Sequence, residues 1–115
     1  MSPWIETSII AVLVFGLALD PAYAVAGDAG KGKRIYRENC KQCHGPSGKG
    51  EGYTKFNPPP SDLPSQRVRE TVDAGLIKTI HDGRANTAMG TWRLALSDEE
   101  IEDVVAYIRT LGRKP

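Results

Sequence analysis

The sequence predicts one small all-α domain. Apolar residues recur at helical spacing in the second half of the chain, most clearly over residues 97–111. No stretch alternates apolar and polar residues over a useful length, as a half-buried strand would. With 115 residues, the chain also has the length of a single domain.

The first 26 residues differ in composition from the rest of the chain. Residues 9–19 form an unbroken apolar run, Asp20-Pro21 ends it, and two overlapping Ala-x-Ala sequences follow within residues 22–26. This order is typical of a secretory signal peptide, although the segment before the run carries Glu6 and no basic residue. The alternative is a retained membrane anchor, for which the run is short because a span needs about 20 apolar residues. We expect residues 1–26 to be a signal peptide and residues 27–115 to be the mature domain.

Residues 28–40 are predicted to form the first helix, with Asp28 as its N-cap. Gly30 and Gly32 are poor helix formers, so another cause, such as the close approach of a second helix, must explain them. The alternative is that this segment is simply a frayed helix start. Residues 44–61 are predicted to be a loop, because glycines recur there and three prolines follow one another. A loop of this length is unusual in a compact domain unless it wraps around something.

The middle of the domain is predicted to be partly helical. Residues 68–81 have apolar positions at helical spacing and should form one or two short helices, with Asp73 as a candidate internal cap and Gly83 as the stop. Residues 84–93 are expected to be a second loop.

The last helix, over residues 97–111, is the most clearly predicted element. Ser97 and Glu100 have the spacing of a capping box, and the acidic residues of the first turn suit the positive end of the helix dipole. Gly112 is placed to end the helix. One face of the helix is apolar and consists of Ile101, Val104, Val105, Ile108 and Leu111.

The two cysteines of the chain lie in the sequence Cys40-Lys41-Gln42-Cys43-His44. This C-x-x-C-H pattern is typical of a c-type haem attachment site. Two thiols on one helical turn can each bond a vinyl group of the same porphyrin, and His44 can then reach the iron as its proximal ligand. We therefore predict one haem c, covalently attached through Cys40 and Cys43. Such a cofactor would also complete the core of a domain of roughly 90 residues, which is small.

Two other interpretations of the motif stay open at this point. A Cys-x-x-Cys pair can be a thiol redox site, but that interpretation expects a βαβ environment, which the sequence does not show. The motif could instead supply three zinc ligands with His81 as the fourth, but the adjacent Cys43 and His44 suit a tetrahedral site poorly.

These parts, in this order, resemble a class I (monohaem) cytochrome c of the bacterial periplasmic type. The resemblance covers a Gly-x-x-x-Tyr helix, the C-x-x-C-H motif, a Gly/Pro loop, a middle helix, a methionine loop and a terminal helix with an aromatic residue. It implies the small cytochrome c fold, with three to four helices around one covalently bound haem. It also implies that the first and last helices cross where small and aromatic residues meet, at Gly32 and Tyr36 and at Val104 and Tyr107.

The resemblance implies Met89 as the second axial ligand, because the family places this methionine in the loop before the last helix. The family often has Met-Pro here, whereas this chain has Met89-Gly90, which loosens the loop. His81 is the competing ligand, and its ligation would lower the reduction potential. The expected cofactor-binding residues are Cys40, Cys43, His44 and Met89, and the expected metal ligands are His44 and Met89.

The resemblance also suggests supporting roles for residues near the haem. One of the prolines 58–60 is a candidate to support the hydrogen bond that orients the proximal histidine. Arg84 and Trp92 are candidates for contact with a haem propionate, with core packing or a solvated surface as the alternatives. Three lysines are candidates to rim the exposed haem edge and to steer an acidic partner, with a scattered distribution over the surface as the alternative. These lysines are Lys41, Lys49 and Lys55.

With His44 and Met89 both on the iron, no coordination position is open to a substrate, so we expect one-electron transfer and no enzymatic activity. The expected protein is a monomeric carrier in the periplasm that meets its redox protein partners transiently. Residues 27–115 contain 15 basic and 12 acidic residues, and this net charge of +3 is too small to suggest nucleic acid. The alternatives are a membrane-tethered subunit of a respiratory or photosynthetic complex and a haem sensor or enzyme with a labile sixth ligand.

Overall fold

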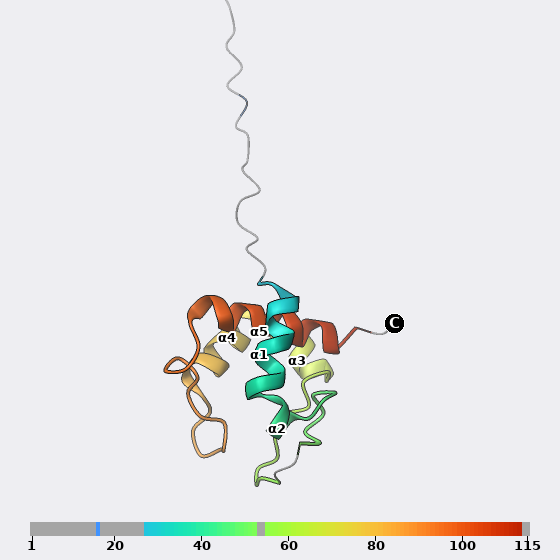
Figure 1. Ribbon diagram of the computed structural model, residues 1–115. Coiled ribbons are helices and arrows are strands. Elements are labelled where there is room, and N and C mark those ends of the chain that lie inside the picture. Colours follow the sequence, from blue (N-terminus) through green and yellow to red (C-terminus); the bar gives the residue numbers. More distant parts are fainter. Residues whose placement is uncertain (1–15, 17–26, 53–54, 114–115) are drawn as a thin grey trace, which may run out of the picture.

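The computed structural model describes residue 16, residues 27–52 and residues 55–113, so most of the expected signal peptide lies outside it. The described residues form five helices and no strand, which confirms the all-α class (Figure 1). The expected number was three to four helices. The count of five includes two short helices, α2 with four residues and α3 with five. None of the helices in the described part is long and apolar enough to cross a bilayer. In chain order the helices are α1 (Ala29–Asn39), α2 (Lys41–His44), α3 (Gln66–Glu70), α4 (Asp73–Asp82) and α5 (Asp98–Leu111).

Helix α1 crosses α5 at the centre of the molecule (Figure 1). A Cβ atom on Gly32 would lie 1.8 Å from the carbonyl oxygen of Asp103, so only glycine allows the two backbones to approach this closely. The rings of Tyr36 and Tyr107 pack beside this contact with centroids 5.1 Å apart, and Val104 is fully buried. The crossing that the resemblance implied is therefore confirmed, and it explains the glycine in the first helix.

The ends of the two long helices are capped as the sequence predicts. The side chain of Asp28 accepts a hydrogen bond from the backbone N–H of Lys31 at the start of α1. At the start of α5, the Ser97 hydroxyl accepts from the Glu100 N–H, and the Glu100 carboxylate accepts from the Ser97 N–H at 2.8 Å. This reciprocal pair is the predicted capping box.

The middle helices differ from the prediction in two details. Helix α3 begins before residue 68, because the Ser65 hydroxyl accepts from the Val68 N–H and caps it. Asp73 is not a cap, because Val72 occupies the N-cap position of α4 and has no side-chain hydrogen bond there. Asp73 instead pairs with Arg109 of α5 at 2.7 Å.

The core lies between α5 and the faces of the other long helices that pack against it. Around this core lies a second set of apolar side chains that are only partly buried, and Met89 and the first cysteine of the motif are among them. The buried side chains are Ile35, Tyr36, Val68, Ile80, Leu96, Ile101, Val104, Val105 and Ile108. The partly buried ones are Cys40, Leu63, Leu76, Ile77, Met89 and Trp92.

Candidate haem site

Helix α2 follows α1 directly and carries the cysteine motif. The backbone N–H of Cys40 donates to the Tyr36 carbonyl at the end of α1, and the N–H of His44 donates to the Cys40 carbonyl at 2.9 Å. Cys40 and Cys43 are therefore held on a single helical turn, as two thioether links to one porphyrin require. Both thiols are free and half-buried.

A loop that we call the proximal loop, residues 45–52 and 55–65, packs against this turn. A Cβ atom on Gly52 would lie 2.3 Å from the Gln42 carbonyl oxygen and 2.4 Å from that of Cys43, so the loop meets α2 backbone to backbone. The buried hydroxyl of Tyr36 donates to the Gly45 carbonyl at 2.6 Å, and burial raises the pKa of this tyrosine. The cysteine turn is thus fixed from α1 on one side and from the proximal loop on the other.

The environment of the thiols argues against a dithiol redox site. Burial, assisted by the neighbouring Cys43, raises the pKa of Cys40 to about 12. Reactive thiols instead have lowered pKa values, because the thiolate is the nucleophile. A neutral thioether suits this half-buried position better than a thiolate would.

The His44 ring is oriented by the proximal loop. Its Nδ1 atom lies 3.2 Å from the carbonyl oxygen of Ser61. Because a carbonyl can only accept, Nδ1 carries the proton and Nε2 keeps its lone pair for a metal. Burial lowers the pKa of His44, which favours the neutral ring that ligation needs. The acceptor is the carbonyl of Ser61, directly after the three prolines, so none of residues 58–60 accepts this bond itself.

The zinc interpretation finds no support in the described residues. They contain no group of three or more histidine, cysteine, aspartate or glutamate side chains that could hold a metal ion. The ring of His81 faces carboxylates on both sides, with Nδ1 at 2.6 Å from Asp82 and Nε2 at 3.9 Å from Asp98. His81 therefore belongs to a surface charge cluster with these two carboxylates.

Met89 lies in a second loop, residues 83–97, which we call the methionine loop. Its side chain is half-buried and packs against the core. The loop is fastened to the end of α4, because the N–H of Trp92 donates to the Ile80 carbonyl at 3.1 Å and the Thr91 hydroxyl donates to the His81 carbonyl at 2.6 Å. Both loops extend from the same side of the α1–α5 crossing (Figure 1).

The two residues considered for propionate contact have protein partners here. The Arg84 guanidinium donates to the Ser61 hydroxyl at 3.1 Å, which joins the methionine loop to the proximal loop. Trp92 is half-buried and packs against the core. The link between the loops is a contact that sequence reasoning missed, because nothing in either loop indicates that Arg84 and Ser61 meet.

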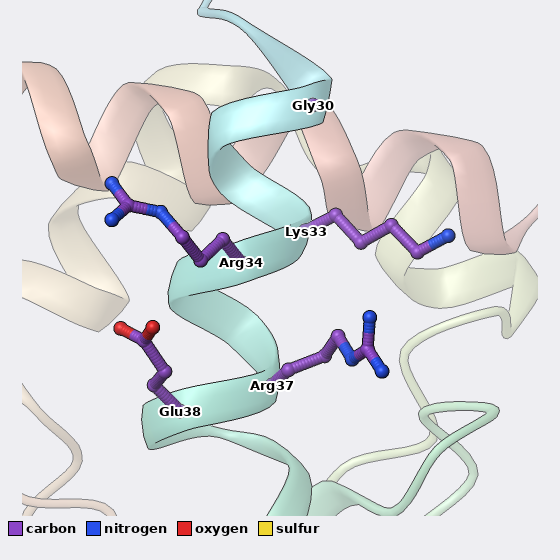
Figure 2. A pocket seen from close by; sticks show the side chains of 5 residues that line it. All are labelled: Gly30, Lys33, Arg34, Arg37 and Glu38. Atoms are coloured by element: carbon purple, nitrogen blue, oxygen red, sulfur yellow. The ribbon is translucent and has the colours of Figure 1, made fainter.

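A basic surface also covers the outer face of α1, beyond the lysines named from the sequence. Lys49 and Lys55 are exposed, but Lys41 is half-buried. The side chains of Lys33, Arg34 and Arg37 project outward along α1 and, with Gly30 and Glu38, line a shallow groove of about 390 Å³, the basic α1 groove (Figure 2). Residues 29–39 carry four basic residues and one acidic residue, so this helix has the same net charge, +3, as all of residues 27–115. The concentration of basic residues in residues 29–39 is visible in the sequence and could have indicated this basic surface.

Comparison with known proteins agrees with this geometry. The profile of the family described as Cytochrome c matches residues 29–112. The chain belongs to the cytochrome c family. It is 32% identical to cytochrome c6 of Gloeothece citriformis, over 99% of this chain and 98% of that protein. It is also 32% identical to cytochrome c-554(547) of Halothiobacillus neapolitanus, over 75% of this chain and 99% of that protein.

Other relatives are longer proteins. The cbb3-type cytochrome c oxidase subunit CcoP of Azospirillum sp. (strain B510) is 33% identical over 84% of this chain, and the chain spans only about a third of that subunit's length, 33%. Among solved structures, cytochrome c6 from the diatom Phaeodactylum tricornutum superposes with a TM-score of 0.56 and 27% identity, over 75% of this chain and 95% of that one. The small cytochrome c fold is therefore shown by both sequence and structure.

One haem c is attached covalently to this cytochrome c through Cys40 and Cys43. The residues present fit it: two free thiols lie on one turn, and the adjacent histidine has its Nδ1 engaged. Partly buried apolar side chains, including Leu63 and Met89, border the core beside the two loops and suit a large flat apolar group.

Proposed function

We propose that this cytochrome c is a periplasmic one-electron carrier whose haem iron is held axially by His44 and Met89. The haem supplies one-electron exchange between ferric and ferrous iron. The polypeptide supplies both ligands, and with two protein ligands no position is left for a substrate. The proposal therefore includes the absence of enzymatic activity.

The hydrogen bond from His44 Nδ1 to the Ser61 carbonyl carries this proposal. It fixes the tautomer and orientation of the ring and raises its basicity, as the outer-shell partner of a metal-bound histidine does. Met89 is the only methionine in residues 27–115, and its half-buried side chain lies in a loop that α4 holds in place. His81 is engaged with two carboxylates, which favours Met89 as the second ligand.

Replacing the proposed second ligand tests this assignment. Met89→Ala should keep the haem on its two cysteines, lose the long-wavelength absorbance band of ferric iron bound to methionine sulfur, lower the reduction potential and bind carbon monoxide readily. Leu94→Ala is the matched control, because Leu94 is an apolar residue of the same loop that is 83% exposed. A Met89→Ala protein with the potential and carbon monoxide reactivity of the wild type would show that Met89 is not a ligand.

The similarity to CcoP and FixP subunits supports a second candidate, a cytochrome domain tethered in a membrane complex. We favour the free carrier because cytochrome c6 and cytochrome c-554(547) match this chain over nearly their whole length. The intact mass of the purified protein separates the two. Loss of residues 1–26 with gain of one haem supports the carrier, whereas a mass that includes Met1 supports the tether.

Met89-Gly90 supports a third candidate, a sensor or enzyme with a labile sixth ligand, because glycine does not stiffen the loop as proline would. Ready binding of carbon monoxide to the wild-type ferrous protein, without the iron–methionine band in the ferric form, would favour this candidate over the carrier.

A further inference from the structure

Arg84 contacts both loops that support the proposed axial ligands. It is the second residue of the methionine loop, five residues before Met89, and its side chain reaches Ser61 in the proximal loop. His44 ends α2 and is oriented by the proximal loop, whereas Met89 lies in the methionine loop, so a residue that touches both loops can fix the relative positions of the two ligands.

The backbone of Arg84 closes the loop around Met89. The N–H of Arg84 donates to the Met89 carbonyl at 3.0 Å. The Thr87 hydroxyl donates to the Arg84 carbonyl at 2.8 Å and accepts from the Met89 N–H at 3.1 Å. Residues 84–89 therefore form a closed turn whose two ends are hydrogen-bonded to each other.

The side chain of Arg84 extends this support to the opposite ligand. Its Nη1 atom donates to the Ser61 hydroxyl at 3.1 Å, while the Ser61 carbonyl accepts from His44 Nδ1 at 3.2 Å. A continuous path of contacts thus runs from the His44 ring through Ser61 and Arg84 to the backbone of Met89.

We propose that Arg84 is a positioning residue that ties the His44 support to the Met89 turn through the Ser61 hydroxyl. This inference rests on the proposed axial ligation by His44 and Met89. With Gly90 after the methionine, the loop has no proline to stiffen it, so the contact with Ser61 supplies a restraint from outside the loop. Breaking that contact releases Met89 from the iron more often and leaves the haem attached.

A double-mutant cycle on the ferric haem-loaded protein tests the contact. The variants are Arg84→Met, Ser61→Ala and their combination, none of which removes a backbone hydrogen bond to Met89 or His44. Cyanide is the probe, because it binds the iron only when the sixth ligand has left. Each single variant should bind cyanide about 2- to 10-fold more tightly, the range that corresponds to the loss of one hydrogen bond.

The combination decides between the contact and the charge of Arg84. If the two side chains act through one hydrogen bond, the double variant binds cyanide no more tightly than the stronger single variant. If Arg84 acts only by its positive charge, Ser61→Ala should not change the cyanide affinity. Arg84→Met should then raise that affinity equally with serine or alanine at position 61. Arg93→Met is the matched control, because it removes a positive charge from the same loop, and Arg93 pairs with Asp82 at 3.6 Å.

The proton NMR shifts of the haem methyl groups in the ferric protein give a second readout. They respond to the orientation of both axial ligands, so Arg84→Met and Ser61→Ala should change them in the same direction, while Arg93→Met leaves them unchanged. Additive effects in the cycle, or unchanged methyl shifts, would overturn the role of Arg84 alone. A wild-type protein without the iron–methionine band would overturn Met89 ligation and the role of Arg84 together.

Discussion

The α1–α5 crossing and the two loops that hold His44 and Met89 in place are stabilised in different ways. At the crossing, Tyr36 is 1% exposed and Val104 is fully buried, and the helix backbones touch at Gly32. Beside the loops, His44 and Met89 are half-buried and are positioned by hydrogen bonds with neighbouring backbone and side-chain groups. The crossing is thus a packed scaffold, and the loops are a polar framework around an apolar cofactor.

This difference separates stability from ligation. A change in a close-packed crossing cannot be absorbed locally, so it lowers the free energy of unfolding of the whole domain. A change in a hydrogen-bonded loop acts first on the residues that it orients. We therefore expect substitutions at the crossing to alter unfolding, and substitutions in the loops to alter the spectrum and the reduction potential.

The largest effect is expected from a side chain at the crossing. Gly32→Val places its Cβ about where the Asp103 carbonyl lies, 1.8 Å from the oxygen, and neither backbone can move away without separating α1 from α5. The variant should lose roughly 3 kcal/mol or more of unfolding free energy, or fail to accumulate as folded haem protein. Denaturant unfolding, followed by circular dichroism, measures the loss.

Gly30→Ala is the control for that variant. Gly30 lies on the same helix, but its Cβ would meet only the side chain of Asp28, at 3.1 Å. Since alanine favours a helix over glycine, the change should stay within about 1 kcal/mol of the wild type. Equal losses for Gly30→Ala and Gly32→Val would mean that helix propensity, and not the close approach, determines the effect.

A smaller loss is expected where the scaffold meets the proximal loop. Tyr36→Phe keeps the ring packed on Tyr107 but removes the buried hydroxyl that donates to the Gly45 carbonyl at 2.6 Å. Leaving that carbonyl without its donor should cost about 1–3 kcal/mol. Thermal unfolding of haem-loaded protein measures it, and Tyr107→Phe, at the half-buried partner of the same ring pair, is the comparison. A Tyr36→Phe protein as stable as the wild type would contradict the role of this bond.

Sequence signals predicted the scaffold better than they predicted the loops. The capping box of α5 is local in sequence, and the resemblance to cytochromes c implied the glycine at the crossing. The C-x-x-C-H motif is also local in sequence, and it predicted the attached haem. In contrast, His44 is supported by the backbone carbonyl of Ser61. Because every residue has a backbone carbonyl, no residue type in the sequence indicates which one accepts this bond. Asp73 was expected to cap a helix from its place in the helical pattern, but it pairs with Arg109, which lies 36 residues away, and no local pattern indicates that contact.

The proximal loop should also show a distinct response to acid. The Glu51 carboxylate accepts from the Ser47 N–H at 2.7 Å and from the Ser47 hydroxyl, and these bonds lower the pKa of Glu51 from 4.5 to about 2. Because the folded pKa lies below the unfolded one, the contribution of Glu51 is fully present above pH 4.5 and is lost as the pH falls toward 2.

Glu51→Gln measures this contribution. Above pH 4.5 the variant should be less stable than the wild type, and the two should converge as the pH approaches 2. Denaturant unfolding at several pH values between 6 and 2, at the same ionic strength, gives the difference at each pH. A difference that does not change with pH would mean that the Glu51 carboxylate has the same pKa in the folded and the unfolded protein. That result would contradict the assignment of the lowered pKa to Ser47.

The smallest effect is expected at the surface, in the basic α1 groove. Neither the scaffold nor the loops depend on Arg37, which is exposed in the last turn of α1, three residues before Cys40. Its positive charge should attract an acidic redox partner toward the haem attachment turn, and removal of one such charge should change the rate of encounter by about 2-fold at low salt. Because exposed charges are screened within about 10 Å at 0.1 M salt, the effect should disappear as the salt concentration rises.

Two small redox reagents of opposite charge can serve as probes of this groove. Arg37→Gln should slow oxidation of the ferrous protein by anionic ferricyanide and speed reduction of the ferric protein by cationic hexaammineruthenium(II), with the spectrum and unfolding midpoint unchanged. Lys78→Gln is the matched control, because Lys78 is also exposed but pairs with Asp82 at 2.7 Å, on α4. If both variants change the two rates equally, only the net charge of the protein matters. If Arg37→Gln alone changes them, the groove itself lies on the path by which electrons enter and leave.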